Sequence, residues 1–129
     1  MNLGPAPEVV RRYFEAVNGA DWAAVPALWA PDGELRAVGA PVRRGPDEIA
    51  AHFPWTLSTL PVHHDEPTRV VVAGSVVLVE IHFSGRTRDD RPVEFDAVDV
   101  FDLTGDGDRI ARLTSWYDTA AVGRMVRGT

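Results

Sequence analysis

The 129-residue sequence contains no cysteine, which excludes disulfide scaffolds, thiolate metal sites and cysteine nucleophiles. It also lacks an HExxH motif, a glycine-rich phosphate loop and a GxSxG nucleophile elbow. The adjacent histidines, His63 and His64, point to opposite faces of an extended strand and so cannot easily share one metal ion. We therefore expect a protein without a metal or another cofactor.

Long apolar runs and basic stripes are missing as well. No stretch approaches the roughly 20 apolar residues that span a bilayer, and residues 1–7 lack the pattern of a signal peptide. The net charge is −6 and the basic residues are scattered, so neither nucleic acid nor an anionic membrane is an expected partner. The length and the hydrophobic fraction of 45% fit one globular domain over residues 1–129, which we expect to be cytoplasmic.

The N-terminal half has the periodicity of helices. The first expected helix covers residues 6–18, with its apolar face formed by Val9, Val10, Tyr13, Phe14 and Val17. A short second helix is expected after Asp21, and a third begins at Pro46, a favourable first helical residue.

After Pro61 the pattern changes to that of strands. Three long stretches at 62–73, 76–86 and 93–103, and a fourth at 109–117, are joined by short turns, which implies an antiparallel meander. The expected fold is therefore α+β: a curved antiparallel or mixed sheet of about four long strands plus short N-terminal strands. Three N-terminal helices would close it into a cone-shaped pocket.

The order and spacing of five motifs resemble a known superfamily. The motifs are VVRRYFEAV (9–17), NGADW (18–22), LWAPDG (28–33), RGPDEI (44–49) and IARLTSWYD (110–118). The superfamily includes nuclear transport factor two, ketosteroid isomerase, limonene epoxide hydrolase and the SnoaL-like polyketide cyclases. The resemblance implies a nuclear transport factor two-like fold with a hydrophobic pocket.

The resemblance also implies roles for single residues. Tyr13 and Asp99 match the tyrosine and the protonated acid of the ketosteroid isomerase oxyanion hole, whereas Ala37 stands at the position of its general base. In the limonene epoxide hydrolase pattern, the arginine and aspartate of the middle strand would fall near Glu80 and His82. Its second acid would fall near Ser115.

The chemistry of Asp99 supports a functional role independently. Along residues 93–103, Asp99 shares one face with Phe95, Ala97 and Phe101, and apolar surroundings favour the neutral form of an acid. A neutral acid can donate a hydrogen bond to a developing oxyanion. The alternative is that Asp99 only bonds a backbone amide or a tyrosine and fixes the fold. Likewise, Tyr13 is either a hydrogen-bond donor in the pocket or a packed core residue.

Glu80 and His82 share the face of their strand opposite to Val77, Val79, Ile81 and Phe83. Two orientations are open. They point outward to solvent, as in a half-exposed strand, or they point into the pocket and form a general base with its orienting acid.

Further predicted pocket residues come from the helices and from the last strands. The resemblance turns Leu113, Ser115 and Tyr117 inward and Trp116 outward, and an exposed tryptophan on a sheet suggests a homodimer through the outer sheet face. The predicted substrate-binding residues are Trp29, Phe53, Trp55, Phe95, Ala97, Phe101, Leu113, Ser115 and Tyr117.

The leading functional hypothesis is a small cofactor-independent isomerase or cyclase. It would act on an apolar, carbonyl-bearing polyketide- or steroid-like molecule through an enolate, with Tyr13 and Asp99 stabilising the oxyanion and His82, oriented by Glu80, as the base. Two alternatives remain open. One is a non-catalytic binder of an apolar small molecule, supported by Ala37. The other is an epoxide hydrolase-like enzyme, which needs an acid pair formed by Asp99 and Glu80.

Overall fold

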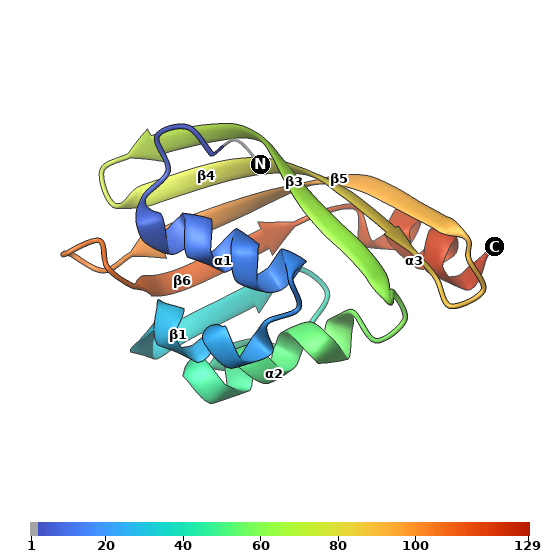
Figure 1. The fold of residues 1–129 in the computed structure, drawn as a ribbon, viewed down its shortest axis with the longest axis horizontal. Coiled ribbons are helices and arrows are strands. Elements are labelled where there is room, and N and C mark those ends of the chain that lie inside the picture. Colours follow the sequence, from blue (N-terminus) through green and yellow to red (C-terminus); the bar gives the residue numbers. More distant parts are fainter. Residues whose placement is uncertain (1–2) are drawn as a thin grey trace.

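The computed structural model describes residues 3–129 as six strands, three α-helices and two 3₁₀ turns (Figure 1). In chain order these are α1 (Glu8–Asn18), η1 (Trp22–Ala24), η2 (Pro26–Leu28), β1 (Trp29–Ala37), β2 (Arg43–Arg44), α2 (Pro46–Thr56), β3 (Val62–Ala73), β4 (Val76–Arg86), β5 (Pro92–Leu103), β6 (Ile110–Trp116) and α3 (Thr119–Arg127).

The strands form one mixed sheet in the order β2-β1-β6-β5-β4-β3. Strands β3 to β6 are a continuous antiparallel meander, while β1 pairs with β6 in parallel. The sheet curls, and α1 and α2 cover its concave side (Figure 1). The helix α3 lies at the far end of the sheet, beside the β4–β5 hairpin (Figure 1). The α+β class and the curved sheet are as predicted from the sequence.

The details of the helices differ from the prediction. The expected second helix is split into the turns η1 and η2, because Pro26 begins a new turn and cannot continue the preceding one. Only two α-helices therefore precede the meander, and the third, α3, follows it. Asp118 caps α3 by accepting a hydrogen bond from the Ala121 amide, and Gly128 ends it in the left-handed conformation at φ 76°.

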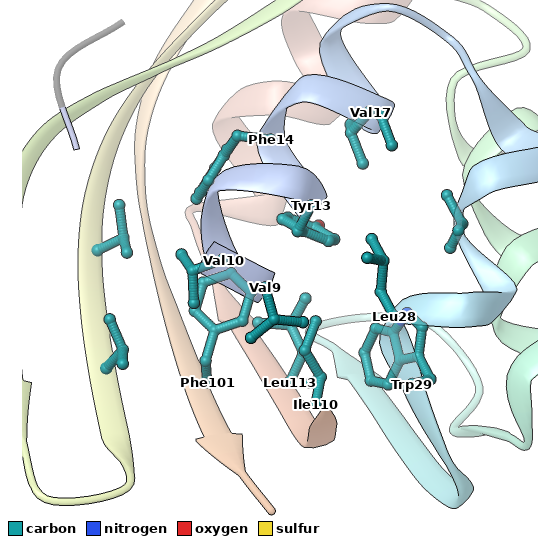
Figure 2. Close-up of a cluster of buried hydrophobic side chains, with 14 of the residues drawn as sticks. Val9, Val10, Tyr13, Phe14, Val17, Leu28, Trp29, Phe101, Ile110 and Leu113 are labelled. Atoms are coloured by element: carbon teal, nitrogen blue, oxygen red, sulfur yellow. The ribbon is translucent and has the colours of Figure 1, made fainter. Parts of the chain in front are cut away.

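The main core lies between α1 and the sheet. The apolar face of α1 is buried, and the rings of Tyr13, Phe14 and Phe101 meet edge to face with centroids 5.1 to 5.9 Å apart (Figure 2). This packing fixes α1 over the inner face of the sheet and so positions Tyr13. Within residues 3–129, the helices are too short or too polar to cross a membrane.

Candidate functional site

A pocket of about 180 Å³ lies between the helices and the inner face of the sheet. Apolar side chains dominate its lining. The polar side chains among the described residues that line it are Tyr13, Thr56, Thr59, Asp65, Asp99, Ser115 and Tyr117. A mostly apolar pocket with a few convergent polar groups is typical of a small-molecule site.

Most of the residues predicted to bind substrate line this pocket. They are Phe53, Phe95, Ala97, Leu113, Ser115 and Tyr117, together with Tyr13 and Asp99. Trp29 and Phe101 do not line it, because both are fully packed in the core. Trp55 does not line it either: 56% of Trp55 is exposed, and its ring lies 4.9 Å from the Arg43 guanidinium carbon.

The inward orientation of Glu80 and His82 is wrong. Both lie on the face of β4 opposite to the pocket, where Glu80 pairs with Arg69 at 2.5 Å. His82 Nδ1 lies 2.9 Å from the Asp96 carboxylate, and its Nε2 lies 3.3 Å from that of Glu94. These hydrogen bonds raise the pKa of His82. The outward alternative applies because Val77, Val79, Ile81 and Phe83, the apolar set of the same strand, fill the inner face.

Asp99 is buried at the centre of the inner face. Its pKa is raised to about 7, chiefly because burial disfavours the charged form; the charge of Asp65 adds to the rise, and the Ser115 hydroxyl opposes it. Ser115 is its direct partner in the β5–β6 register. Asp99 therefore keeps a substantial protonated fraction at neutral pH and can donate a hydrogen bond.

Tyr13 approaches the same pocket from α1. Burial raises the pKa of its phenol well above the ordinary value, and the charges of Asp99 and Asp65 add to the rise. The hydroxyl makes no hydrogen bond within residues 3–129 although the ring is packed among Phe14, Phe53 and Phe101. It is thus a neutral donor free to bond a ligand.

A second acid, Asp65, reaches the pocket from β3. It pairs in register with Phe83, whose ring lines the pocket, so its side chain belongs to the inner face. Burial raises the pKa of Asp65 to about 6, against the charges of His63 and His64. Its carboxylate has no hydrogen-bond partner within the described part of the chain.

Two reciprocal hydrogen bonds hold the backbone at Asp65. The Asp65 amide donates to Asn18 Oδ1 at 2.8 Å, and Asn18 Nδ2 donates to the Asp65 carbonyl at 2.9 Å. On this edge strand the Asn18 side chain therefore takes the place of a neighbouring strand. His63 Nε2, 2.8 Å from the Val17 carbonyl, ties β3 to the same end of α1.

Asp65 is not predicted from the sequence because it stands in the polar run His63–Glu66, which shows no apolar alternation. The edge position of β3 leaves much of this strand exposed. The pairing of β3 with β4 does not reveal it either. Continued from the hairpin at Gly74 and Ser75, the register would set Asp65 opposite Ser84 on the outer face; an irregularity between Pro67 and Arg69 shifts it by one residue and sets Asp65 opposite Phe83 on the apolar face.

The buried histidine, His52, belongs to a different cluster. Its Nδ1 lies 3.3 Å from Arg43 Nε, and burial together with the Arg43 charge lowers the pKa of His52 to about 4. It does not line the pocket. Among the described residues, no group of three or more histidine, aspartate or glutamate side chains could hold a metal ion.

The chain belongs to the SnoaL-like domain family, whose model matches residues 10–113. The fold and the pocket agree with this assignment. Among curated proteins, none has a sequence that matches this chain.

Solved structures of the same fold cover almost the whole chain. A putative polyketide cyclase from Sinorhizobium meliloti is 30% identical, with a TM-score of 0.73 over 86% of this chain and 95% of that one. A putative SnoaL-like polyketide cyclase from Jannaschia is 17% identical, with a TM-score of 0.84 over 100% and 99% of the two chains. An epoxide hydrolase from M. tuberculosis, described as LEH-like, is 21% identical, with a TM-score of 0.75 over 93% and 87%.

Proposed function

We propose that this protein is a small, cofactor-independent isomerase or cyclase that acts on an apolar, carbonyl-bearing molecule through an enolate. The observation that carries the proposal is the convergence of Asp65, Asp99 and Tyr13 on one apolar pocket. The SnoaL-like family and the 30% identical putative polyketide cyclase support a polyketide-like substrate.

The two acids suit opposite roles. Asp65 is only partly buried and its carboxylate has no hydrogen-bond partner in the described residues, so we assign it as the base. Asp99 is fully buried, which favours its neutral form, and with Tyr13 it donates hydrogen bonds to the substrate oxygen. The carboxylate of Asp65 takes a proton from the carbon next to the carbonyl. The electron pair of that C–H bond forms the C=C bond of the enolate, and the carbonyl oxygen becomes the oxyanion.

The enolate can then react in two ways. Return of the proton from Asp65 to a different carbon completes an isomerisation. Attack of the enolate carbon on a second carbonyl of the same molecule closes a ring, and the proton held by Asp65 then neutralises the new alkoxide. Asp65 supplies the base that Ala37 cannot, from β3 instead of β1.

The proposal can be tested without the natural substrate. The bicyclic ketone 2-tetralone is apolar and has acidic protons beside its carbonyl. In D₂O, we expect the wild-type protein to accelerate deuterium incorporation at carbon 1, followed by proton NMR, and Asp65→Asn to abolish the acceleration. Equal exchange with wild type and Asp65→Asn would overturn the assignment of the base.

The binder alternative predicts a different result in the same experiment. A pure binding protein would bind 2-tetralone, as measured by calorimetry, and leave its deuterium content at the level of the buffer control. Mass spectrometry of a ligand that co-purifies unaltered with the protein would favour this alternative.

Epoxide hydrolysis is a second candidate, favoured by the acid pair itself. The predicted pair of Asp99 with Glu80 is not assembled, since Glu80 lies on the outer face. Asp65 and Asp99 could replace it: the neutral acid would protonate the epoxide oxygen while the carboxylate activates water. Incubation of styrene oxide in H₂¹⁸O distinguishes this activity, because only hydrolysis produces a labelled diol faster than the buffer control.

We also propose that the outer sheet face forms a homodimer in the cytoplasm. Trp116 is 56% exposed there, and Leu78 and Val71 are exposed on the same side of the sheet. A stable monomer rarely leaves such apolar area uncovered. Sedimentation should give a dimer for the wild type and a monomer for Trp116→Glu; a wild-type monomer at high concentration would contradict this proposal.

A further inference from the structure

The charges around the pocket are all of one sign. Among the described residues that line it, only Asp65 and Asp99 are ionisable as acids below neutral pH, and no arginine or histidine is present. The two tyrosines, Tyr13 and Tyr117, both have pKa values raised by burial and add no charge. The pocket therefore offers an anionic ligand no positive partner.

Three basic side chains around this region are held by backbone carbonyls. On the β4–β5 hairpin, Arg88 donates to the Ser58 carbonyl at 2.8 Å. Arg91 donates to the carbonyls of Met125 and Val126 at 2.7 and 2.9 Å. On β3, His63 is bonded to the Val17 carbonyl at 2.8 Å. None of these three basic side chains can turn into the pocket without breaking a contact that supports the fold.

Of the two acids, Asp65 would repel an anionic ligand more strongly. Its carboxylate faces the cavity with no hydrogen-bond partner in residues 3–129, whereas Asp99 has the Ser115 hydroxyl beside it. A ligand carboxylate entering the pocket would meet an ionised Asp65 in apolar surroundings, where solvent screens repulsion weakly. The ligand carboxylate would also lose its hydration without gaining a positively charged partner.

We propose that the pocket takes uncharged ligands and excludes carboxylates, and that Asp65 is the residue that sets this selectivity. The inference rests on the proposed function only for the location of the site. It narrows the substrate class: a polyketide-like molecule with a free carboxylate is refused, and its ester, amide or ketone form is accepted. The reaction that supplies the substrate must therefore mask or remove its acid group.

A matched pair of ligands tests this selectivity. The carboxamide and the carboxylate of 1,2,3,4-tetrahydro-2-naphthoic acid have the same bicyclic skeleton and nearly the same shape, and they differ in charge. By calorimetry at pH 8, we expect the amide to bind the wild type at least about thirtyfold more tightly than the carboxylate, as repulsion between close charges in a protein predicts. In Asp65→Asn this ratio should fall at least about tenfold.

Two controls separate charge from structure. Asp96→Asn removes a negative charge from the outer face, where Asp96 binds His82, and should leave the ratio unchanged. If Asp65→Asn does not fold, the same ratio of affinities is measured for the wild type at pH 8 and at pH 5.5. Protonation of Asp65 should then reduce the ratio at the lower pH, while the ligand carboxylate stays ionised. The groups that act on Asp65 in that titration are Tyr13, His63, His64 and Asp99.

Three results would overturn the inference: carboxylate binding as tight as that of the amide, a ratio that Asp65→Asn and pH both leave unchanged, or no binding of the amide at its solubility limit. Its failure is distinct from that of the proposed function. Tight carboxylate binding together with Asp65-dependent deuterium exchange would reject the selectivity alone. Intact selectivity without exchange would reject catalysis alone.

Discussion

Asp65 and Asp99 face one pocket from β3 and β5, two strands that β4 separates in the sheet. Asp65 belongs to a cross-strand row with Phe83 and Phe95, and Asp99 to a second row with Val79 and Ser115. The curl of the sheet turns both rows towards the same cavity. A ligand in this cavity could therefore contact both acids, one from each row.

The oxyanion role of Asp99 and Tyr13 predicts a loss of rate with little loss of binding. Tyr13→Phe and Asp99→Leu each keep nearly the same size and remove one donor; Asp99→Asn would not, because its amide group still donates. We expect each to slow deuterium exchange into 2-tetralone on the order of 10²-fold, as removal of an oxyanion-hole donor does. Calorimetry should give a dissociation constant within about threefold of the wild type, and unchanged exchange in both variants would reject this role.

His82 lies outside the pocket, so its removal should not affect catalysis. His82→Ala deletes the contacts with Asp96 and Glu94 on the outer face. We expect exchange rates within about twofold of the wild type, in contrast to Asp65→Asn. A large loss in His82→Ala would restore the histidine base that the sequence suggested.

The raised pKa of Asp99 predicts a pH-dependent stability. An aspartic acid titrates near pH 4 in an unfolded chain, and Asp99 titrates at about 7 in the folded one. Between these values the folded state holds a proton that the unfolded state has lost. The stabilisation from this proton is therefore fully present below pH 4 and is lost as the pH rises through 7. Asp99→Asn removes this pH dependence of the free energy of unfolding, because asparagine does not titrate.

Urea denaturation at intervals from pH 4 to pH 8 measures the effect. The difference in free energy of unfolding, Asp99→Asn minus wild type, should increase by on the order of 3 kcal/mol over this range. Surface acids such as Asp89, whose pKa an arginine partner lowers to about 2, act in both proteins and cancel in the difference. A difference that stays constant with pH would contradict the titration of Asp99.

Arg91 attaches α3 to the rest of the fold. The helix has no buried residue of its own, although Val122 and Val126 line the pocket. Arg91→Ala removes two hydrogen bonds to the last turn of α3. We expect the free energy of opening α3 to fall by on the order of 1–2 kcal/mol. Hydrogen exchange of the α3 amides measures this. Arg124→Ala, on the same helix but without a side-chain hydrogen bond in the described chain, should leave their protection unchanged.

The sequence was informative where a residue's environment depends on its own strand or helix. The placement of Asp99 followed from alternation along β5, and that of Tyr13 from the helical periodicity of α1. For His82, alternation along β4 separated the two faces of the strand but left open which face turns to the pocket. The burial of Val77, Val79 and Ile81 decides it, because the apolar face is the inner one.

Two features depended on structure that no local pattern encodes. Asp65 lies on an edge strand whose polar run hides the inward position, and the Asn18 side chain supplies the missing neighbour. The helix α3 is short, with no buried residue to give it a periodic signal; its cap at Asp118 and its anchor at Arg91 define it instead.

In the proposed mechanism, two aspartic acids in one pocket divide the roles of base and acid, and both must therefore titrate above the ordinary range of a carboxyl group. Carbon-detected NMR of the side-chain carboxyl groups, assigned with Asp65→Asn and Asp99→Asn, follows both acids in the wild type. We expect both to titrate well above pH 4, Asp65 at about 6 and Asp99 at about 7. Titration of both groups near pH 4 would contradict it, because no neutral acid would then remain at physiological pH to stabilise the enolate.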